Sequence, residues 1–389
     1  MATKIIMLGG RRAGKSSILA SVVHQLKNAP ADLFTVSDST DYQSSDKSAV
    51  SLIDKRREVE RYIQLNNKLP RNSIFQVDMT PSDAISEYQV KTKINGSHDV
   101  EFSFVDVPGE AMEIGKSYRK ELETLVGACD VFMVAIDTPY MMQPDEGVCD
   151  VYNRVSEITD ILANNIVIKE DRDNLRNWDK KLIILAPVKC EKWTRSGHAD
   201  AVKERTLQVY KQLINTWVNN PCVEIWVMPL ETVGGIEHAS LMDGYRAYKT
   251  ASDKVGEVVS VNDLTGMVHF KNGRTCDPAD LYMVENDPDA SLLKNFTQLP
   301  LSWYRTNGDK FTPKNCEQPA YQIIRFLVEK EANVFRSQGD SFFRKILEFL
   351  GFVPPFGESL AAYKEAVNKI ARMVVKDREG IAKITELIP

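Results

Sequence analysis

Short apolar runs alternate with amphipathic stretches over residues 1–238. The runs are typical of strands buried on both faces of a sheet, and the stretches repeat hydrophobic residues at helical spacing. This alternation predicts an α/β fold with a doubly wound, mostly parallel sheet, whose ligands bind at the carboxyl ends of its strands. The runs lie at residues 5–8, 129–137, 181–188 and 222–228, and the amphipathic stretches at residues 17–26, 47–65, 147–165 and 200–219.

Residues 86–107 follow a different pattern, in which hydrophobic and polar residues alternate one by one. The alternation spans residues 86–94 and 100–105, and Asn95-Gly96 lies between them. Because Asn-Gly favours the tight turn that joins two antiparallel strands, this segment predicts a β-hairpin.

The pattern changes again beyond residue 238. Short alternating segments around residues 255–261 and 267–273 predict a small β-rich insertion over residues 239–320. Residues 321–389 repeat apolar residues at helical spacing and predict a C-terminal helical extension, with its last helix at residues 360–387. We expect the first of these helices to complete the domain formed by residues 1–238.

Composition and charge exclude several classes of protein. The chain has 389 residues, of which 43% are hydrophobic and 26% charged, and its net charge of −5 does not indicate a nucleic-acid binder. The six cysteines form no C-x-x-C pair and the five histidines show no ligand spacing, so we expect reduced thiols in a cytoplasm. No apolar run approaches the roughly 18 residues of a spanning helix, and the N-terminal residues do not resemble a signal peptide.

The turn after the first apolar run carries the first candidate chemistry. Residues 9–16 fit G-x-x-x-x-G-K-[ST], in which glycines let backbone N–H groups surround phosphate oxygens and the following helix adds its positive end. We expect Lys15 to reach the β- and γ-phosphates of a nucleotide and Ser16 to place its hydroxyl on Mg²⁺. The candidate binding residues of this loop are Gly9, Gly10, Arg11, Arg12, Ala13, Gly14, Lys15, Ser16 and Ser17.

A second motif, Asp106-Val-Pro-Gly109, follows the second strand of the predicted hairpin. An aspartate at the tip of a strand beside a phosphate loop can hold Mg²⁺, directly or through water. The glycine three residues later lets its backbone N–H turn towards a γ-phosphate. We therefore expect Asp106 and Gly109 to complete the site that begins at Lys15 and Ser16.

With these two motifs, residues 1–238 resemble the Ras-like GTPases of the translation-factor-related (TRAFAC) class of P-loop proteins. Within that class the chain is most similar to the larger bacterial GTPases found in multi-gene conflict or defence systems. The resemblance implies Mg²⁺ as cofactor, GTP and GDP as bound nucleotides, and a cytoplasmic molecular switch with a protein effector or activating partner. A membrane surface is a less favoured partner, and a nucleotide-dependent dimer is a further candidate arrangement.

The same family reads the base with an N/T-K-x-D motif, and this chain has Val188-Lys189-Cys190-Glu191 in its place. Glu191 keeps the carboxylate that would accept hydrogen bonds from guanine, and Lys189 would pack its stem on the base. Val188 lacks the side chain that usually ties this loop to the phosphate loop. After the last apolar run, Thr232 and Val233 are the candidates for the family's weaker base-contacting loop.

In the same family, a mobile loop also supplies a hydroxyl ligand to Mg²⁺. The corresponding loop of this chain lies within residues 33–80. Ser73 and Thr80 are the two candidates, and the sequence does not decide between them.

Two residues at the expected reaction centre predict slow hydrolysis. Arg11 stands where small Ras-like enzymes usually have glycine, so it would either block the attacking water or act as an internal arginine finger. Glu110 replaces the glutamine that orients this water, and its charge beside the γ-phosphate is unfavourable. The candidate catalytic residues are therefore Lys15, Arg11, Gly109 and Glu110. The alternatives are a nucleotide-sensing scaffold with negligible hydrolysis and an ATP-using P-loop NTPase.

Overall fold

The computed structural model divides into two compact units. The first contains residues 1–56, 81–232 and 313–389, and the second contains residues 57–80 and 233–312. The structure describes residues 3–27, 34–36, 52–68, 74–75, 85–94, 98–112, 118–168, 180–247, 258–261, 268–270, 275–276, 296–307, 310–327, 372–374 and 379–384.

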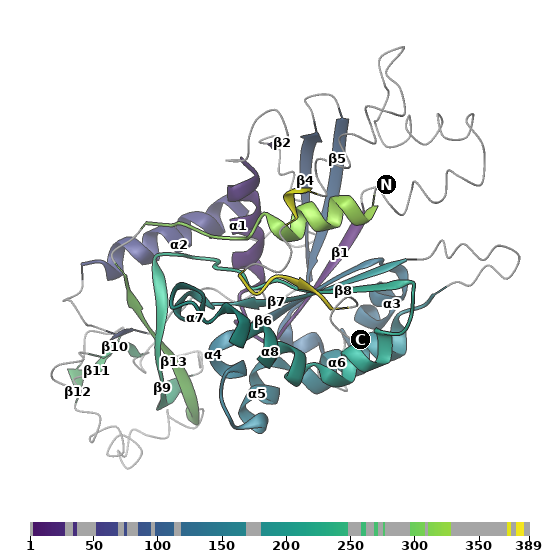
Figure 1. Ribbon diagram of the computed structural model, residues 1–389. Coiled ribbons are helices and arrows are strands. Elements are labelled where there is room, and N and C mark those ends of the chain that lie inside the picture. The colour runs from purple at the N-terminus through teal and green to yellow at the C-terminus, as the bar shows by residue number, and fades with distance from the viewer. Residues whose placement is uncertain are drawn as a thin grey trace, which may run out of the picture. The chain divides into compact units, whose positions relative to one another are not determined.

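The first unit is built on a mixed sheet of eight strands in the order β14-β8-β7-β6-β1-β5-β4-β2. Its centre, from β8 to β5, is parallel, and antiparallel strands flank it on both sides. This arrangement confirms the predicted α/β class with a mostly parallel sheet (Figure 1). The strands are β1 (Thr3–Leu8), β2 (Phe34–Val36), β4 (Ser86–Ile94), β5 (His98–Asp106), β6 (Val131–Asp137), β7 (Lys181–Val188), β8 (Val223–Val227) and β14 (Ala382–Lys383).

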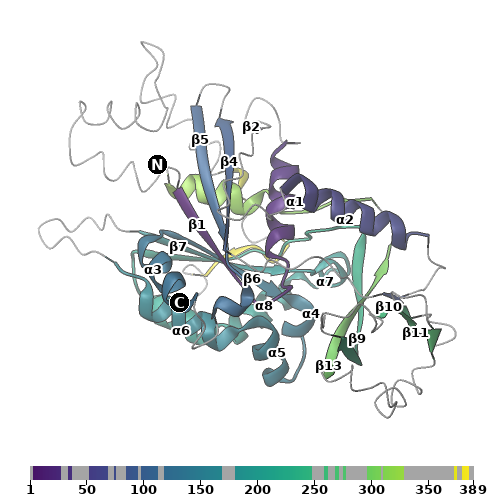
Figure 2. The same ribbon diagram turned by 180° about the vertical axis from the view of Figure 1, so that it is seen from behind.

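Helices cover both faces of this sheet, as a doubly wound fold requires. Figures 1 and 2 show α3, α6 and α8 on one side, and α1 with the light-green helix of residues 318–327 on the other. Strand residues alternate between the two cores, so that Ile5 and Met7 pack on the α1 side while Ile6 and Leu8 pack on the α3 side. The covering helices are α1 (Lys15–Lys27), α3 (Arg119–Ala128), α6 (Val155–Asn165), α8 (Ala199–Val209) and α9 (Lys211–Trp217).

The predicted hairpin is present as β4 and β5, which pair antiparallel from Ser86↔Asp106 to Ile94↔His98. Strand β5 also pairs parallel with β1, and Asp106 is the register partner of Met7. This pairing brings the end of the hairpin to the end of β1, where the glycine-rich loop begins.

The stretch predicted as one helix over residues 147–165 is interrupted. It forms α5 (Glu146–Asn153) and α6, which are separated by Arg154 in a left-handed conformation with φ 55°. A short helix, α4 (Thr138–Met141), lies between β6 and α5.

The second unit contains a six-stranded sheet in the order β12-β11-β10-β3-β13-β9. Its boundaries differ from the predicted insertion of residues 239–320, because β3 pairs with β10 and β13, and Val59 and Ile63 of α2 (Leu52–Asn66) pack in its core. Residues 57–80 therefore belong with residues 233–312. The strands are β3 (Ile74–Phe75), β9 (Ile236–Ala247), β10 (Val258–Val261), β11 (Val268–Phe270), β12 (Thr275–Cys276) and β13 (Phe296–Thr306).

The C-terminal residues also depart from the prediction of helices throughout 321–389. Residues 318–327 form a helix whose Ile323, Ile324 and Phe326 are buried in the core on the α1 side. Ala382–Lys383, however, forms strand β14, which pairs antiparallel with β8. The strand is favoured because it buries Ile381 and Ile384 in the two opposite cores of the sheet. Most of the helix predicted at residues 360–387 lies outside the described residues.

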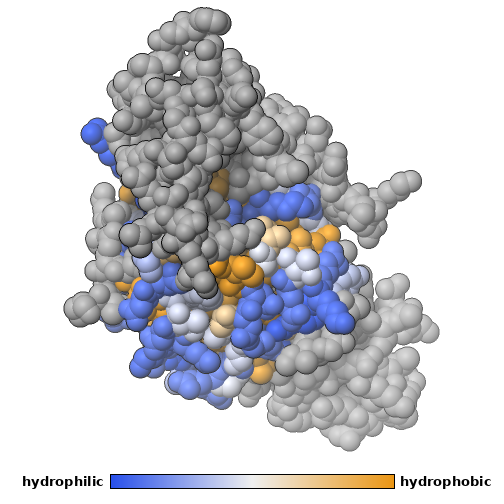
Figure 3. Space-filling model, turned by 90° about the vertical axis from the view of Figure 1, so that its right-hand side faces the viewer, coloured by the Kyte–Doolittle hydropathy of each residue, from blue (hydrophilic) through white to orange (hydrophobic). Residues whose placement is uncertain are grey.

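The outer surface gives no indication of a membrane-spanning element. Among the described residues, no helix combines the length and the apolarity needed to cross a bilayer. Figure 3 shows mainly hydrophilic residues over the described part of one face, with some hydrophobic residues exposed between them.

Candidate functional site

The loop between β1 and α1 has the backbone that its glycines permit. Gly9 and Gly14 have φ angles of 148° and 103°, a range that side chains disfavour. A Cβ atom on Gly9 would also lie 2.6 Å from the carbonyl oxygen of Ala135 in β6. The loop therefore depends on glycine both for its turn and for its close approach to the neighbouring strand.

Lys15 lies across this loop with its side chain almost fully buried. Its Nζ donates hydrogen bonds to the carbonyl oxygens of Gly9, at 2.9 Å, and Gly10, at 3.1 Å. Burial lowers the pKa of Lys15, and the charge of Asp106 opposes this shift. The ammonium group is thus held at the loop, where a phosphate would compete with the two carbonyl groups for it.

Ser16 and Asp106 meet at the start of α1. The Ser16 Oγ donates a hydrogen bond of 2.8 Å to Asp106 Oδ2, across 90 residues of sequence, and the Asp106 side chain is fully buried. A hydroxyl beside a carboxylate fits the oxygen ligands that Mg²⁺ prefers. The described residues include no cluster of three or more His, Cys, Asp or Glu side chains suited to a metal.

Gly109 brings the second motif against the phosphate loop. A Cβ atom at this position would lie 2.4 Å from the Arg11 nitrogen and 2.8 Å from the Gly10 carbonyl carbon, so only glycine allows this approach. Gly109 begins the short helix η1 (Gly109–Met112), which contains the backbone of Glu110. Nothing can be placed for the Glu110 side chain, which lies outside the described part of the structure, whereas the side chain of Arg11 is exposed.

Lys189 connects the loop after β7, the predicted base-recognition loop of residues 188–191, to the phosphate loop. Its Nζ donates a 2.8 Å hydrogen bond to the Arg12 carbonyl and forms an ion pair with Asp137 at the end of β6. The family resemblance places this connection at position 188, where valine lacks the side chain to make it. The structure makes it through Lys189, while Val188 packs its methyl group 3.3 Å from where a Cβ of Gly14 would lie.

Glu191 begins the short helix α7 (Glu191–Arg195), and its side chain is only 2% exposed. Burial is the main cause that raises the pKa of the Cys190 and Cys316 thiols, and the Glu191 charge adds to it in both cases. The carboxylate therefore lies among buried groups in this structure. A base could reach it only after a change in this loop.

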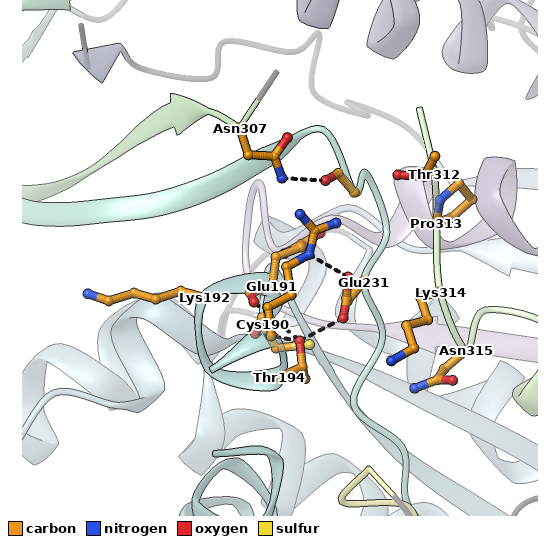
Figure 4. Close-up of polar contacts among 12 residues, drawn as sticks. Cys190, Glu191, Lys192, Thr194, Glu231, Asn307, Thr312, Pro313, Lys314 and Asn315 are labelled. Atoms are coloured by element: carbon orange, nitrogen blue, oxygen red, sulfur yellow. Dashed lines mark hydrogen bonds and ion pairs between the residues drawn. The ribbon is translucent and has the colours of Figure 1, made fainter. Parts of the chain in front are cut away.

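The loop after β8 contributes a carboxylate that the sequence analysis did not select. Glu231 is 2% exposed and accepts hydrogen bonds from Thr194 Oγ1, at 2.8 Å, and Arg195 Nε, at 3.1 Å (Figure 4). The only sequence indication was its place just after a buried strand. Glu231 thus anchors α7 to the end of β8 and fixes the helix that contains Glu191.

The other predicted site residues are placed separately. The carbonyl of Thr232 accepts a 2.5 Å hydrogen bond from Ser21 Oγ in α1. Val233 belongs to the second unit and packs on its core, so the structure does not group it with the loop residues. Ser73 and Thr80 lie outside the described residues.

Comparisons with known proteins add only distant structural likenesses. No protein-family model matches the chain, and neither does any curated protein. Among solved structures, the chain is similar to the S. cerevisiae Ski7 GTPase-like domain bound to GTP, with 15% identity, a TM-score of 0.28, and coverage of 59% of this chain and 42% of that chain. For the same domain bound to GDP and inorganic phosphate, the values are 14%, 0.27, 59% and 43%. The chain spans less than half of the length of these structures, so the site has to be argued from its own geometry.

Proposed function

We propose that this chain is a Mg²⁺-dependent GTP-binding protein that hydrolyses GTP slowly to GDP and phosphate and acts as a nucleotide-controlled switch for a protein partner. The observation that carries the proposal is the hydrogen bond between Ser16 and Asp106. It joins the two sequence motifs at one point, beside the ammonium of Lys15 and the backbone of Gly109.

Each residue has a distinct part in this proposal. The backbone N–H groups of residues 10–16 surround the β-phosphate, and Lys15 exchanges its carbonyl partners for phosphate oxygens. Ser16 and Asp106 would hold Mg²⁺, which would supply positive charge to the phosphates. The backbone N–H of Gly109 senses the γ-phosphate, so that η1 occupies different positions with GTP and with GDP.

The proposal of slow hydrolysis rests on the residue types at positions 11 and 110. Catalysis of phosphoryl transfer depends on positioned charge and on an oriented water molecule. Arg11 is exposed in the phosphate loop and would lie near the phosphates, whereas Glu110 offers a carboxylate in place of a neutral amide. We expect a protein partner to supply the missing orientation, as activating proteins do for the class.

The burial of Glu191 favours a second candidate, an NTPase that does not discriminate guanine from adenine. A guanine-reading carboxylate has to accept hydrogen bonds from the base, and at 2% exposure Glu191 can do so only after α7 shifts. The preference for GTP over ATP is therefore the part of the proposal that the burial of Glu191 opposes most directly.

Calorimetry with GTP, GDP and ATP analogues in the presence of Mg²⁺ tests both candidates. We expect the wild type to bind GTP and GDP more tightly than ATP, and Lys15→Ala to lose binding of all three. The matched control is Lys181→Ala, because Lys181 is also buried but lies at the amino end of β7. A wild type that binds ATP as tightly as GTP supports the second candidate, and one that binds no nucleotide contradicts both.

A further inference from the structure

An ion pair lies at the carboxyl ends of the neighbouring strands β6 and β7. Asp137 is the last residue of β6 and is 3% exposed, and its carboxylate pairs with the Nζ of Lys189, just beyond β7. The same Nζ donates to the carbonyl of Arg12 at 2.8 Å, and Arg12 has a left-handed φ of 63°. One ammonium group therefore joins a buried carboxylate to a bent residue of the phosphate loop.

The position of Asp137 is itself fixed by α5. Asn153 is fully buried, and its Oδ1 accepts a 2.6 Å hydrogen bond from the Asp137 N–H while its Nδ2 donates to the Asp137 carbonyl at 3.3 Å. The preceding residue, Tyr152, approaches the phosphate loop so closely that a Cβ on Gly10 would lie 1.9 Å from its carbonyl oxygen. The end of α5 thus holds both Asp137 and the loop that Lys189 contacts.

Stability alone does not account for this arrangement. Burial raises the pKa of Asp137, and the Lys189 ammonium opposes that rise, which shows a carboxylate held where its charge is costly. A buried ion pair is commonly no more stabilising than apolar residues of the same volume. What the pair provides is a fixed place for the Lys189 ammonium on the Arg12 carbonyl.

We propose that Asp137 is a positioning residue for nucleotide binding, which holds Lys189 on the Arg12 carbonyl and so fixes the base-recognition loop against the phosphate loop. This inference rests on the proposed function. Asp137 contacts no nucleotide itself and acts through Lys189. The contact of Lys189 with the Arg12 carbonyl replaces the connection to the phosphate loop that Val188 cannot make.

The test compares Asp137→Asn with Asp130→Asn by calorimetry. The asparagine keeps the shape of Asp137 but removes the charge that orients Lys189, and we expect GTP and GDP to bind about 10- to 100-fold more weakly, the range for a lost hydrogen bond to a charged group. The affinities for GTP and GDP should fall by the same factor, because the contacts of both loops include parts that the two nucleotides share. Asp130 pairs with Lys181 at 2.8 Å at the amino ends of the same strands, so its variant should bind as the wild type does.

A double-mutant cycle with Lys189→Met separates positioning from a general structural role. If Asp137 acts through Lys189, the double variant should bind no more weakly than Lys189→Met alone, at unchanged binding stoichiometry. Additive losses, a lower stoichiometry at unchanged affinity, or wild-type affinity in Asp137→Asn overturn the proposal. A wild type that binds no nucleotide is a different result, which overturns the proposed function and this inference with it.

Discussion

The strands β6 and β7 have a lysine–aspartate pair at each end, and the two pairs differ in what else the lysine touches. At the amino ends, Lys181 Nζ contacts Asp130 at 2.8 Å and the carbonyl of Cys129 at 3.1 Å. At the carboxyl ends, Lys189 pairs with Asp137 and donates to a carbonyl 177 residues away in the sequence. Each lysine thus contacts both a carboxylate and a backbone carbonyl.

This difference shows that an ion pair takes its role from its place in the sheet. Cys129 lies two residues before β6, so the amino-end pair joins the starts of two neighbouring strands. The carboxyl-end pair reaches the loop after β1, because in a parallel sheet the strand-to-helix loops gather at that edge. The two ends are about 23 Å apart along a seven-residue strand, so each can be altered without contact with the other.

The largest difference between the two ends should appear with glycine-to-alanine substitutions. In Gly109→Ala, the new Cβ would lie 2.4 Å from the Arg11 nitrogen, and only a shift of backbone can relieve this contact. We expect η1 to move away from the phosphate loop and GTP affinity to fall about 100-fold, with little change for GDP, because in the proposed function the Gly109 N–H contacts only the γ-phosphate. Calorimetry with GTP and GDP measures this ratio.

Gly127→Ala is the control near the amino end of β6. Gly127 lies in α3, and its Cβ would meet only the Asn165 carbonyl, at 3.6 Å, an ordinary contact. Alanine favours the helix by about 0.5–1 kcal/mol, so the free energy of unfolding should rise without an effect on nucleotides. Unchanged GTP affinity in Gly109→Ala would contradict the role given to η1.

The sequence predicted the sheet of the first unit because its central strands are buried on both faces. Every residue of β6 and β7 is buried, which produces the continuous apolar runs that the prediction used. Strands β3 and β14 were missed because two residues carry no periodicity. Their pairing depends on partners that are distant in sequence. Because β3 pairs with β10 and β13, residues 57–80 belong to the second unit.

Within the candidate site, the residues of contiguous motifs could be predicted and the connections between motifs could not. Lys15 and Ser16 lie in one short pattern whose chemistry is local. Asp137 closes an apolar run and looks like an ordinary strand end, and its partner Lys189 appeared only as part of a base-reading motif. Asn153 lies in a stretch that was predicted as one helix. Nothing in its spacing indicates that its side-chain amide hydrogen-bonds to the backbone of Asp137 in β6.

A smaller difference is expected between two serine-to-alanine substitutions. Ser16→Ala removes the hydroxyl that donates to Asp106. The factor by which Mg²⁺ raises GTP affinity should therefore be about tenfold smaller than in the wild type. The measured quantity is the ratio of GTP affinity with Mg²⁺ to that with a chelator.

Ser103→Ala provides the matched control on β5, three residues before Asp106. Its buried hydroxyl donates to Glu87, further from the carboxyl edge, so the variant should lose about 1 kcal/mol of stability and keep the wild-type Mg²⁺ ratio. Equal ratios in the two variants would show that Ser16 has no special relation to the metal.

The smallest expected effect concerns the buried cysteine beside each pair, Cys129 at the amino end and Cys190 at the carboxyl end. Burial raises the pKa of the Cys129 thiol to about 11 and that of Cys190 well above its usual value. At pH 8 about one Cys129 thiol in a thousand is ionised, so alkylation by iodoacetamide should be slow and rise about tenfold per pH unit.

Nucleotide should then separate the two thiols. In the proposed function GTP and Mg²⁺ stabilise the loop that contains Lys189 and Cys190, so we expect Cys190 to be alkylated several-fold more slowly with nucleotide, while Cys129 changes little. Peptide mass spectrometry measures both rates in the same sample. If both slow by one factor, the two ends open together as one cooperative unit, and the functional distinction between the two lysine–aspartate pairs loses its basis in local dynamics.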